Sequence, residues 1–219
     1  MKTRGRFITL EGGEGAGKSV QARTLAANLE RAGVATLLTR EPGGSPHAEA
    51  LRELILAGEA KRFGAAGEAL LFSAARIDHI DQTIEPALLR GEWVISDRFA
   101  DSTRAYQGAA GRLDPAFIRR LEQVTVGERR PDLTLILDLN PEIGLKRATV
   151  RRGSEAADRF EREGLSFHAS LRGAFLEIAR QEPERCVVID AGGAEAEVAA
   201  AIWAAVLLRL GEHLPGPVS

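Results

Sequence analysis

Several sequence features are scarce in this chain of 219 residues, and each scarcity excludes a class of protein. The single cysteine, Cys186, can form no internal disulfide and has no second cysteine at metal-ligand spacing. The longest apolar stretch, residues 198–208, is too short to span a bilayer, and the N-terminus lacks the apolar core of a signal peptide. We therefore expect a protein of the reducing cytoplasm, neither secreted nor embedded in a membrane.

The chain also lacks an excess of charge of either sign. It has 29 Lys and Arg against 31 Asp and Glu, so no whole-molecule field would recruit nucleic acid or an anionic membrane. The hydrophobic share of 44% and the charged share of 27% are ordinary for a globular protein. No repeat or low-complexity linker divides the chain. We expect one domain over residues 1–219, with a flexible tail at about 212–219.

Apolar, β-branched runs of strand length alternate with longer helical patterns. The runs fall at 7–10, 34–38, 93–95, 133–137 and 187–189, and the helical patterns near 17–32, 45–57, 65–90, 114–126, 141–150, 161–182 and 194–210. Continuous apolar strands are buried on both faces. The alternation therefore predicts an α/β fold, in which helices cover both faces of a five-stranded parallel sheet. Ligands of such folds bind outside the carboxyl ends of the strands.

The first of these strands leads into a glycine-rich segment, Gly12-Gly13-Glu14-Gly15-Ala16-Gly17-Lys18-Ser19. It fits the pattern G-x-x-x-x-G-K-[ST] between a strand and a helix, where backbone N–H groups converge on phosphate oxygens. Lys18 would bridge the β- and γ-phosphates, and the Ser19 hydroxyl would ligate Mg²⁺. An ordinary glycine-rich turn would explain the glycines but not Lys18-Ser19. The segment predicts a loop that binds ATP·Mg²⁺ through residues 12–19.

The phosphate-binding loop by itself does not separate kinases, GTPases and ATPases. A GTPase reads guanine with an Asn/Thr-Lys-x-Asp segment, yet Asn28 and Asn140 are followed by Leu and Pro, and no Thr-Lys-x-Asp segment exists. The length leaves little room for the additional domains of many motor or transporter ATPases. What remains is a small kinase with an acceptor site built from this one chain.

Further segments, from Phe7 to about Ala191, resemble the thymidylate kinase family in the order that the family shows. They are residues 7–12 with the loop, Thr39-Arg40-Glu41-Pro42-Gly43-Gly44, residues 70–76, Asp97-Arg98-Phe99, residues 102–108 and residues 131–138. The Arg-Glu-Pro-Gly-Gly and Asp-Arg-Phe segments are the most discriminating. The resemblance implies transfer of the γ-phosphoryl group of ATP to dTMP, giving dTDP, by a P-loop kinase with a mobile lid that forms a homodimer.

The resemblance also implies where the acceptor binds. The substrate-binding residues would be Arg40, Phe72, Arg76, Asp97, Arg98, Thr103, Tyr106 and Gln107. Arg98 would fork onto the acceptor phosphate, and Asp97 would lie near the magnesium ion. Phe72 would stack on thymine with Arg76 at its O4 edge, and Tyr106 would lie against C2′ of the sugar. Glu14 would orient the acceptor through its 3′-hydroxyl, and the Glu41-Pro42 bond is a candidate cis peptide.

Residues 151–159 are polar and weakly patterned, so they could form either a solvated loop or an arginine-bearing lid, at about 147–160. The phosphate-binding loop carries no cation before Lys18. By resemblance to bacterial members of the family, the lid would therefore supply the catalytic arginine, from among Arg151, Arg152 and Arg159. Arg147 would stack on adenine. Lys18, Glu14 and Arg98 complete the expected catalytic set.

Each of these roles has a structural alternative. Phe72 could be plain core, Arg40 and Arg76 solvated surface charges, Tyr106 a half-buried packing residue, and Asp97-Arg98 a local ion pair. Two functional alternatives also stay open. The chain could be a kinase for another nucleoside monophosphate such as dUMP, or a nucleotide-gated ATPase switch that has no phosphate acceptor.

Overall fold

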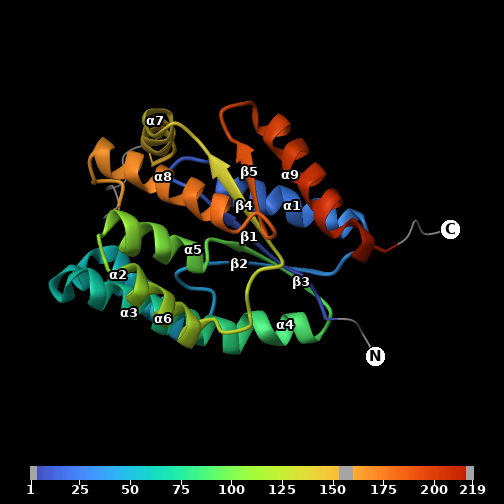
Figure 1. The fold of residues 1–219 in the computed structure, drawn as a ribbon. Helices are drawn as coiled ribbons and strands as arrows, with labels where there is room; N and C mark the ends of the chain where they lie inside the picture. The colour runs from blue at the N-terminus through green and yellow to red at the C-terminus, as the bar shows by residue number, and fades with distance from the viewer. Residues whose placement is uncertain (1–3, 153–159, 216–219) are drawn as a thin grey trace.

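The structure is a computed structural model that describes residues 4–152 and 160–215 (Figure 1). Its strands are β1 (Phe7–Glu11), β2 (Thr36–Arg40), β3 (Trp93–Asp97), β4 (Leu133–Asp138) and β5 (Cys186–Asp190). They pair in parallel, in the order β2-β3-β1-β4-β5. The predicted five-stranded parallel sheet is confirmed. Within the described part of the chain, no helix is both long and apolar enough to cross a membrane.

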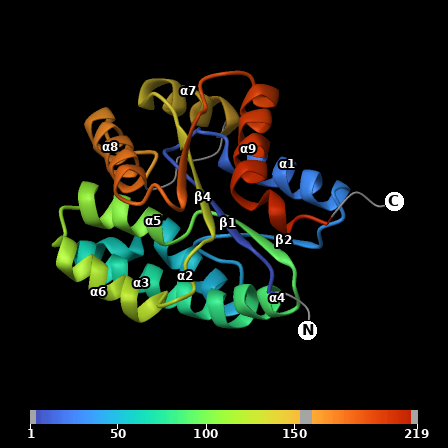
Figure 2. The same ribbon diagram turned by 45° about the vertical axis from the view of Figure 1, so that its right-hand side comes forward.

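Helices connect the strands. They are α1 (Lys18–Arg31), α2 (Pro46–Ala57), α3 (Gly64–His79), α4 (Glu85–Leu89), α5 (Ala100–Thr103), α6 (Pro115–Thr125), α7 (Pro141–Arg152), α8 (Leu165–Gln181) and α9 (Glu195–Leu210). The 3-10 helices are η1 (Glu59–Phe63) and η4 (Gly211–His213), and the π-helices are η2 (Ile80–Ile84) and η3 (Arg104–Ala110). The helices α1 and α9 lie side by side on one face of the sheet, and α3 and α4 lie on the other (Figures 1 and 2).

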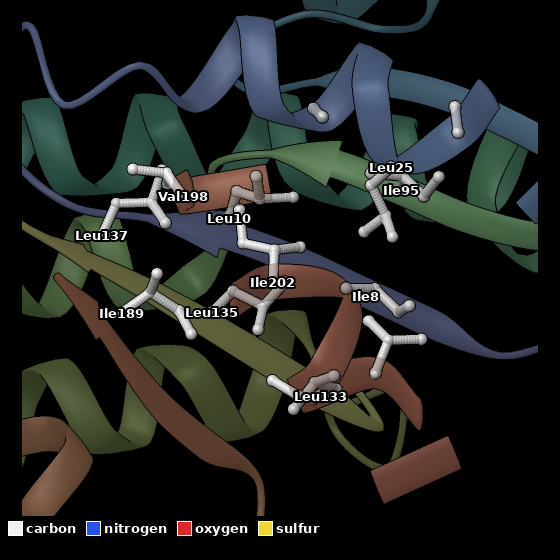
Figure 3. Close-up of a cluster of buried hydrophobic side chains, with 14 of the residues drawn as sticks. Ile8, Leu10, Leu25, Ile95, Leu133, Leu135, Leu137, Ile189, Val198 and Ile202 are labelled. Atoms are coloured by element: carbon white, nitrogen blue, oxygen red, sulfur yellow. The ribbon is translucent and has the colours of Figure 1, made fainter. Parts of the chain in front are cut away.

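The buried side chains form separate clusters on the two faces. Ile8 and Leu10 of β1 pack with Leu25 of α1 and Ile202 of α9 (Figure 3). Phe7 points to the opposite face, where it packs in the cluster formed with η2 and α4. Successive residues of a strand alternate between the two faces of the sheet, so a continuously apolar strand contributes side chains to both clusters.

Several predicted boundaries differ from the structure. The pattern at 65–90 is not one helix but α3, η2 and α4 in succession, because Pro86 can donate no hydrogen bond and its ring obstructs a regular helical ladder. The helix expected near 161 begins at Leu165, after the extended Gly164. The start of the predicted lid is helical, because α7 continues to Arg152.

Two further predictions need correction at the ends of elements. β2 begins at Thr36 rather than Val34, because the Val34 N–H closes the end of α1 by donating to Leu29 O at 3.0 Å. The predicted flexible tail from about 212 is in part folded, since η4 reaches His213 and Leu214 packs on the core. The rest of that predicted tail, residues 216–219, lies outside the described residues.

The strand register brings the predicted polar residues to one edge of the sheet. Asp97 at the end of β3 lies opposite Leu10 of β1 and opposite Arg40 of β2. The backbone continues this pairing, because Glu41 N donates to Asp97 O at 3.0 Å and Arg98 N donates to Leu10 O at 2.9 Å. The carboxyl ends of three strands therefore present their following residues to a common space.

Candidate active site

A cavity of about 620 Å³ opens at this edge of the sheet. The predicted site residues that line it are Glu14, Gly15, Gly17, Lys18, Ser19, Arg40, Phe72, Asp97, Arg98, Thr103, Tyr106, Gln107, Arg147 and Arg151. Gly12, Gly13, Ala16 and Arg76 do not line it. The structure thus brings residues from the phosphate-binding loop, β3, η3 and α7 around one space.

The phosphate-binding loop takes a conformation that needs glycine at particular positions. Gly15 has φ +70°, and a Cβ there would lie only 2.0 Å from Gly144 O of α7. Gly17 has φ +88° and immediately precedes α1. The loop therefore packs tightly against α7 and directs the positive end of the α1 dipole at the cavity, an arrangement that favours an anion.

Lys18 is buried within the loop. Its Nζ donates to Gly13 O at 2.7 Å and to Gly12 O at 3.1 Å. Burial, followed by the nearby charge of Arg98, lowers the pKa of Lys18 to about 8. The ammonium group is therefore held where phosphate oxygens seated in the loop would meet it.

Glu14, Arg98 and Tyr106 form a hydrogen-bonded cluster beside the loop. Glu14 Oε1 accepts from Arg98 Nη2 at 2.8 Å and from the Tyr106 hydroxyl at 2.7 Å, and the Arg98 guanidinium lies 5.0 Å from the Tyr106 ring centre. Burial raises the pKa of Glu14, but Arg98, Lys18 and Tyr106 outweigh it and hold that pKa at about 2. Arg98 pairs with Glu14, so the expected alternative of a local Asp97-Arg98 pair is wrong.

We expect Glu14→Gln to lower the free energy of unfolding at neutral pH by about 2–3 kcal/mol, an effect that shrinks in acid. The pKa of about 2 in the folded protein lies below the ordinary value of 4.5. The unfolded chain binds more protons between these values, so the contribution of Glu14 is complete above pH 4.5 and is lost as pH falls through 2. Urea unfolding of wild type and Glu14→Gln at neutral and acidic pH measures the difference in their free energies of unfolding. An equal difference at the two pH values would contradict an ionised Glu14 paired with Arg98.

Arg98 itself has φ +74°, a left-handed conformation that non-glycine residues seldom adopt. Such strain persists where surrounding contacts hold it and is frequent at functional sites. Here Arg98 Nη1 donates to Gly12 O and to Ser102 Oγ, both at 3.3 Å. The turn after β3 therefore aims the guanidinium back at the phosphate-binding loop.

Arg76 does not line the cavity, and its expected contact with thymine stays a prediction. It is 3% exposed, which excludes the alternative of a solvated charge. Its Nε donates to Glu41 Oε2 at 2.8 Å, and its Nη2 donates to Phe99 O and Thr103 Oγ1 at 3.1 Å each. The guanidinium therefore clamps the segment after β2, where the predicted cis Glu41-Pro42 bond is confirmed.

The other expected acceptor residues surround the same part of the cavity. Phe72, one helical turn before Arg76, is half-buried and lines the cavity, so it is not plain core. Tyr106 is 6% exposed, more buried than the half-buried alternative assumed. Gln107 Nε2 donates to Glu68 Oε2 at 3.1 Å. Arg40 lines the cavity but is largely exposed, paired with Glu49 at 3.0 Å.

Sequence reasoning missed several residues of the site. Arg52 of α2 lines the cavity and donates from Nη1 to Pro42 O at 2.6 Å, although no motif marks it. Glu11 is fully buried and accepts from Phe99 N at 2.7 Å and from Ser102 Oγ at 2.7 Å. This contact holds the start of α5, for which the sequence has no apolar periodicity. Glu11 ends β1 and lies inside the first matching segment, and that position was the only sign of its role.

Two of the lid arginines lie beside the cavity. Arg147 donates to Ala191 O at 2.9 Å and Gly192 O at 3.2 Å, and Arg151 pairs with Glu161 at 2.9 Å. Arg159 lies outside the described residues, and the structure does not describe the side chain of Arg152. Phe160 was missed by sequence reasoning. It lines the cavity with its ring centre 5.0 Å from that of Tyr106.

A phosphate-binding loop after β1, the hydrogen-bonded cluster of Glu14, Arg98 and Tyr106, and an apolar wall at Phe72 share one cavity of a parallel α/β sheet. This arrangement defines the class of P-loop phosphotransferases, with a donor half and an acceptor half in one space. A sequence profile narrows the class. The chain belongs to the thymidylate kinase family, whose profile matches residues 10–202.

Individual relatives agree with the profile. The chain is 62% identical over 208 residues to a thymidylate kinase of Rhodopseudomonas palustris strain CGA009, covering 94% of this chain and 90% of the relative. It is 57% identical over 212 residues to a thymidylate kinase of Afipia carboxidovorans, covering 97% and 93%. A crystal structure of thymidylate kinase from Ehrlichia chaffeensis superposes with a TM-score of 0.75 at 30% identity, covering 93% of this chain and 99% of that one.

Proposed function

We propose that the large cavity is where this member of the thymidylate kinase family transfers the γ-phosphoryl group of ATP to dTMP, giving dTDP. One observation carries the proposal: Lys18 of the donor half and the Arg98 cluster of the acceptor half open onto the same space. A coupled assay with dTMP, dUMP, UMP, CMP, AMP and GMP tests it. We expect dTMP to have the highest kcat/KM. A better acceptor in the panel, or ATP hydrolysis without dTDP, would overturn it.

The protein accelerates the transfer by positioning the two substrates and by neutralising charge on the transferred phosphoryl group. An oxygen of the dTMP phosphate attacks the γ-phosphorus, and the bond from that phosphorus to the β,γ-bridging oxygen breaks, releasing ADP. The attacking oxygen is already anionic, so no general base is needed. Lys18, Arg98 and a lid arginine meet the charge on the moving group, while Glu14 orients the acceptor sugar through its 3′-hydroxyl.

Ser19 and Asp97 are the residues that we assign to Mg²⁺. The Ser19 hydroxyl donates to Asp97 Oδ2, so two hard oxygen ligands adjoin Lys18 at the cavity wall. In the described part of the chain, no group of three or more His, Cys, Asp or Glu side chains forms a metal site. A small set of protein ligands suits Mg²⁺, which phosphates and water complete, and when bound the ion neutralises phosphate charge.

We expect Ser19→Ala to raise the Mg²⁺ concentration needed for half-maximal activity, with partial recovery at high Mg²⁺. The substitution removes one oxygen ligand but leaves Asp97 and the loop backbone. A magnesium titration at saturating ATP and dTMP measures the shift. Ser102→Ala, which removes another hydroxyl at the cavity, is the control. An unchanged magnesium requirement in Ser19→Ala would contradict the assignment.

Tyr106 is proposed to exclude the 2′-hydroxyl of a ribonucleotide. By the family resemblance the ring would lie against C2′ of the acceptor sugar, and Tyr106 is buried in the cavity wall. Tyr106→Ala should therefore narrow the preference for dTMP over its ribose analogue by raising turnover of the ribonucleotide. Tyr106→Phe is the matched control, since it keeps the ring and removes only the hydroxyl bond to Glu14. The ratio of the two kcat/KM values is the measurement. A parallel fall for both acceptors would show that Tyr106 only packs.

We also propose that the protein is a homodimer that pairs through α3 and α6. These helices pack together, and they leave Leu70, Ile77 and Val124 exposed. Apolar side chains exposed on neighbouring helices mark a surface for association. Sedimentation equilibrium tests the proposal, and a mass equal to one chain at micromolar concentration would refute it.

A further inference from the structure

A second, small cavity lies behind the phosphate-binding loop, on the side of α8. Its volume is about 20 Å³, and its walls include Gly13 and Glu14 of the loop, Leu145 of α7, and His168 and Arg172 of α8. One ordered water needs about 10–15 Å³ of such space and two to four polar partners. The cavity therefore has room for one water, and the polar groups around it decide whether a water is held.

The first polar group beside the cavity is the imidazole of His168. The residue is 4% exposed, and its Nε2 has no hydrogen-bond partner among the described residues. Buried side-chain nitrogens in native proteins are nearly always paired, with protein or with ordered water. Arg172, one turn further along α8, fixes the helix to β4 by donating to Asp138 Oδ1 at 2.6 Å and Oδ2 at 2.8 Å. The His168 ring is therefore held in place.

Glu14 supplies the second polar group. Its Oε1 already accepts from both Arg98 and Tyr106, whereas its Oε2 accepts no hydrogen bond from a described residue. Glu14 and His168 line the same small cavity, so a molecule held in it would lie between the two side chains.

We propose that His168 is a positioning residue for Glu14, acting through one ordered water in this cavity. The imidazole Nε2–H donates to the water, and the water donates to Glu14 Oε2. Because Oε1 holds Arg98 and Tyr106, the bridge at Oε2 sets the orientation of the whole cluster. The inference rests on the role proposed above for Glu14 in orienting dTMP, so its effect falls on the acceptor and not on ATP.

The test compares two substitutions at His168. His168→Phe keeps an aromatic ring and removes the nitrogen. We expect kcat/KM for dTMP to fall about tenfold, the size of one lost hydrogen bond, with KM for ATP within about twofold of wild type. His168→Gln can donate from its amide, and we expect it to recover most of that loss. Leu145→Ala, which alters the same wall without a polar group, should stay within about twofold.

Three results would overturn the inference: wild-type kcat/KM for dTMP in His168→Phe, no recovery in His168→Gln, or an equal loss in Leu145→Ala. A high-resolution crystal structure of the unaltered protein tests it independently of folding, since electron density without a water between Nε2 and Oε2 would also refute it. Glu14→Gln separates the two proposals. If Glu14→Gln binds and turns over dTMP normally, the role of Glu14 fails. If Glu14→Gln is impaired and His168→Phe is not, only the bridge fails.

Discussion

Lys18→Ala is expected to abolish dTDP formation, with kcat reduced by about a thousandfold or more, in a protein that remains folded. The substitution removes the cation that the loop holds beside the proposed site of the β- and γ-phosphates. Among the described residues, the ammonium donates hydrogen bonds only to Gly12 O and Gly13 O, and the side chain is not part of an apolar cluster. A coupled assay measures the activity, and circular dichroism with thermal unfolding confirms the fold.

Lys61→Ala is the matched control for this experiment. Lys61 is exposed on η1, so its loss removes the same charge from the molecule as a whole without touching the cavity. We expect its activity to equal that of wild type. Near-normal dTDP production by folded Lys18→Ala would refute the assignment of residues 12–19 as the donor site.

The second large effect concerns the lid. Replacing a lid arginine by Ala should lower kcat by about 10³ or more with little change in dTMP affinity, if that arginine stabilises the transition state. Arg151 lines the cavity with a side chain that is 64% exposed, so its pair with Glu161 contributes little to stability. Its loss should therefore lower kcat and leave the stability of the fold nearly unchanged. Lys at the same position should rescue only in part, because a point charge cannot bridge two oxygens as a guanidinium fork does.

Arg152→Ala and Arg159→Ala complete the series, since the resemblance to bacterial members implies Arg151 or Arg152 together with Arg159. Arg31→Ala, at the exposed end of α1, is the control for the loss of one arginine. Single-turnover rates at saturating dTMP separate chemistry from binding. Rates within a few-fold of wild type in all three lid variants would favour the solvated-loop alternative and refute the lid hypothesis.

The elements that local pattern specifies were predictable, and those that depend on distant contacts were not. The strands were found because each contains a short apolar run. The expected burial on both faces is wrong for the edge strands β2 and β5, which are only partly buried because each has a neighbouring strand on one side alone. No helix was predicted over residues 100–110, because apolar residues do not recur at helical spacing in this segment. It folds as α5 and η3 because Glu11 of β1 binds the backbone where α5 begins.

The phosphate-binding loop is the part that the sequence determined by itself. Its function resides in consecutive residues, and glycines such as Gly15 make its backbone geometry possible. The family resemblance added the prediction of the acceptor residues, and all of these except Arg76 line the large cavity.

Only the tertiary structure decided how those side chains pair. Arg98 pairs with Glu14 rather than with its neighbour Asp97, Arg76 clamps Glu41, and His168 lies behind the loop. Spacing along the chain carries no information on such pairs, because the strand order β2-β3-β1-β4-β5 brings together residues that are far apart in sequence. A charged side chain in a buried site must find a partner, and which partner it finds depends on packing across the sheet.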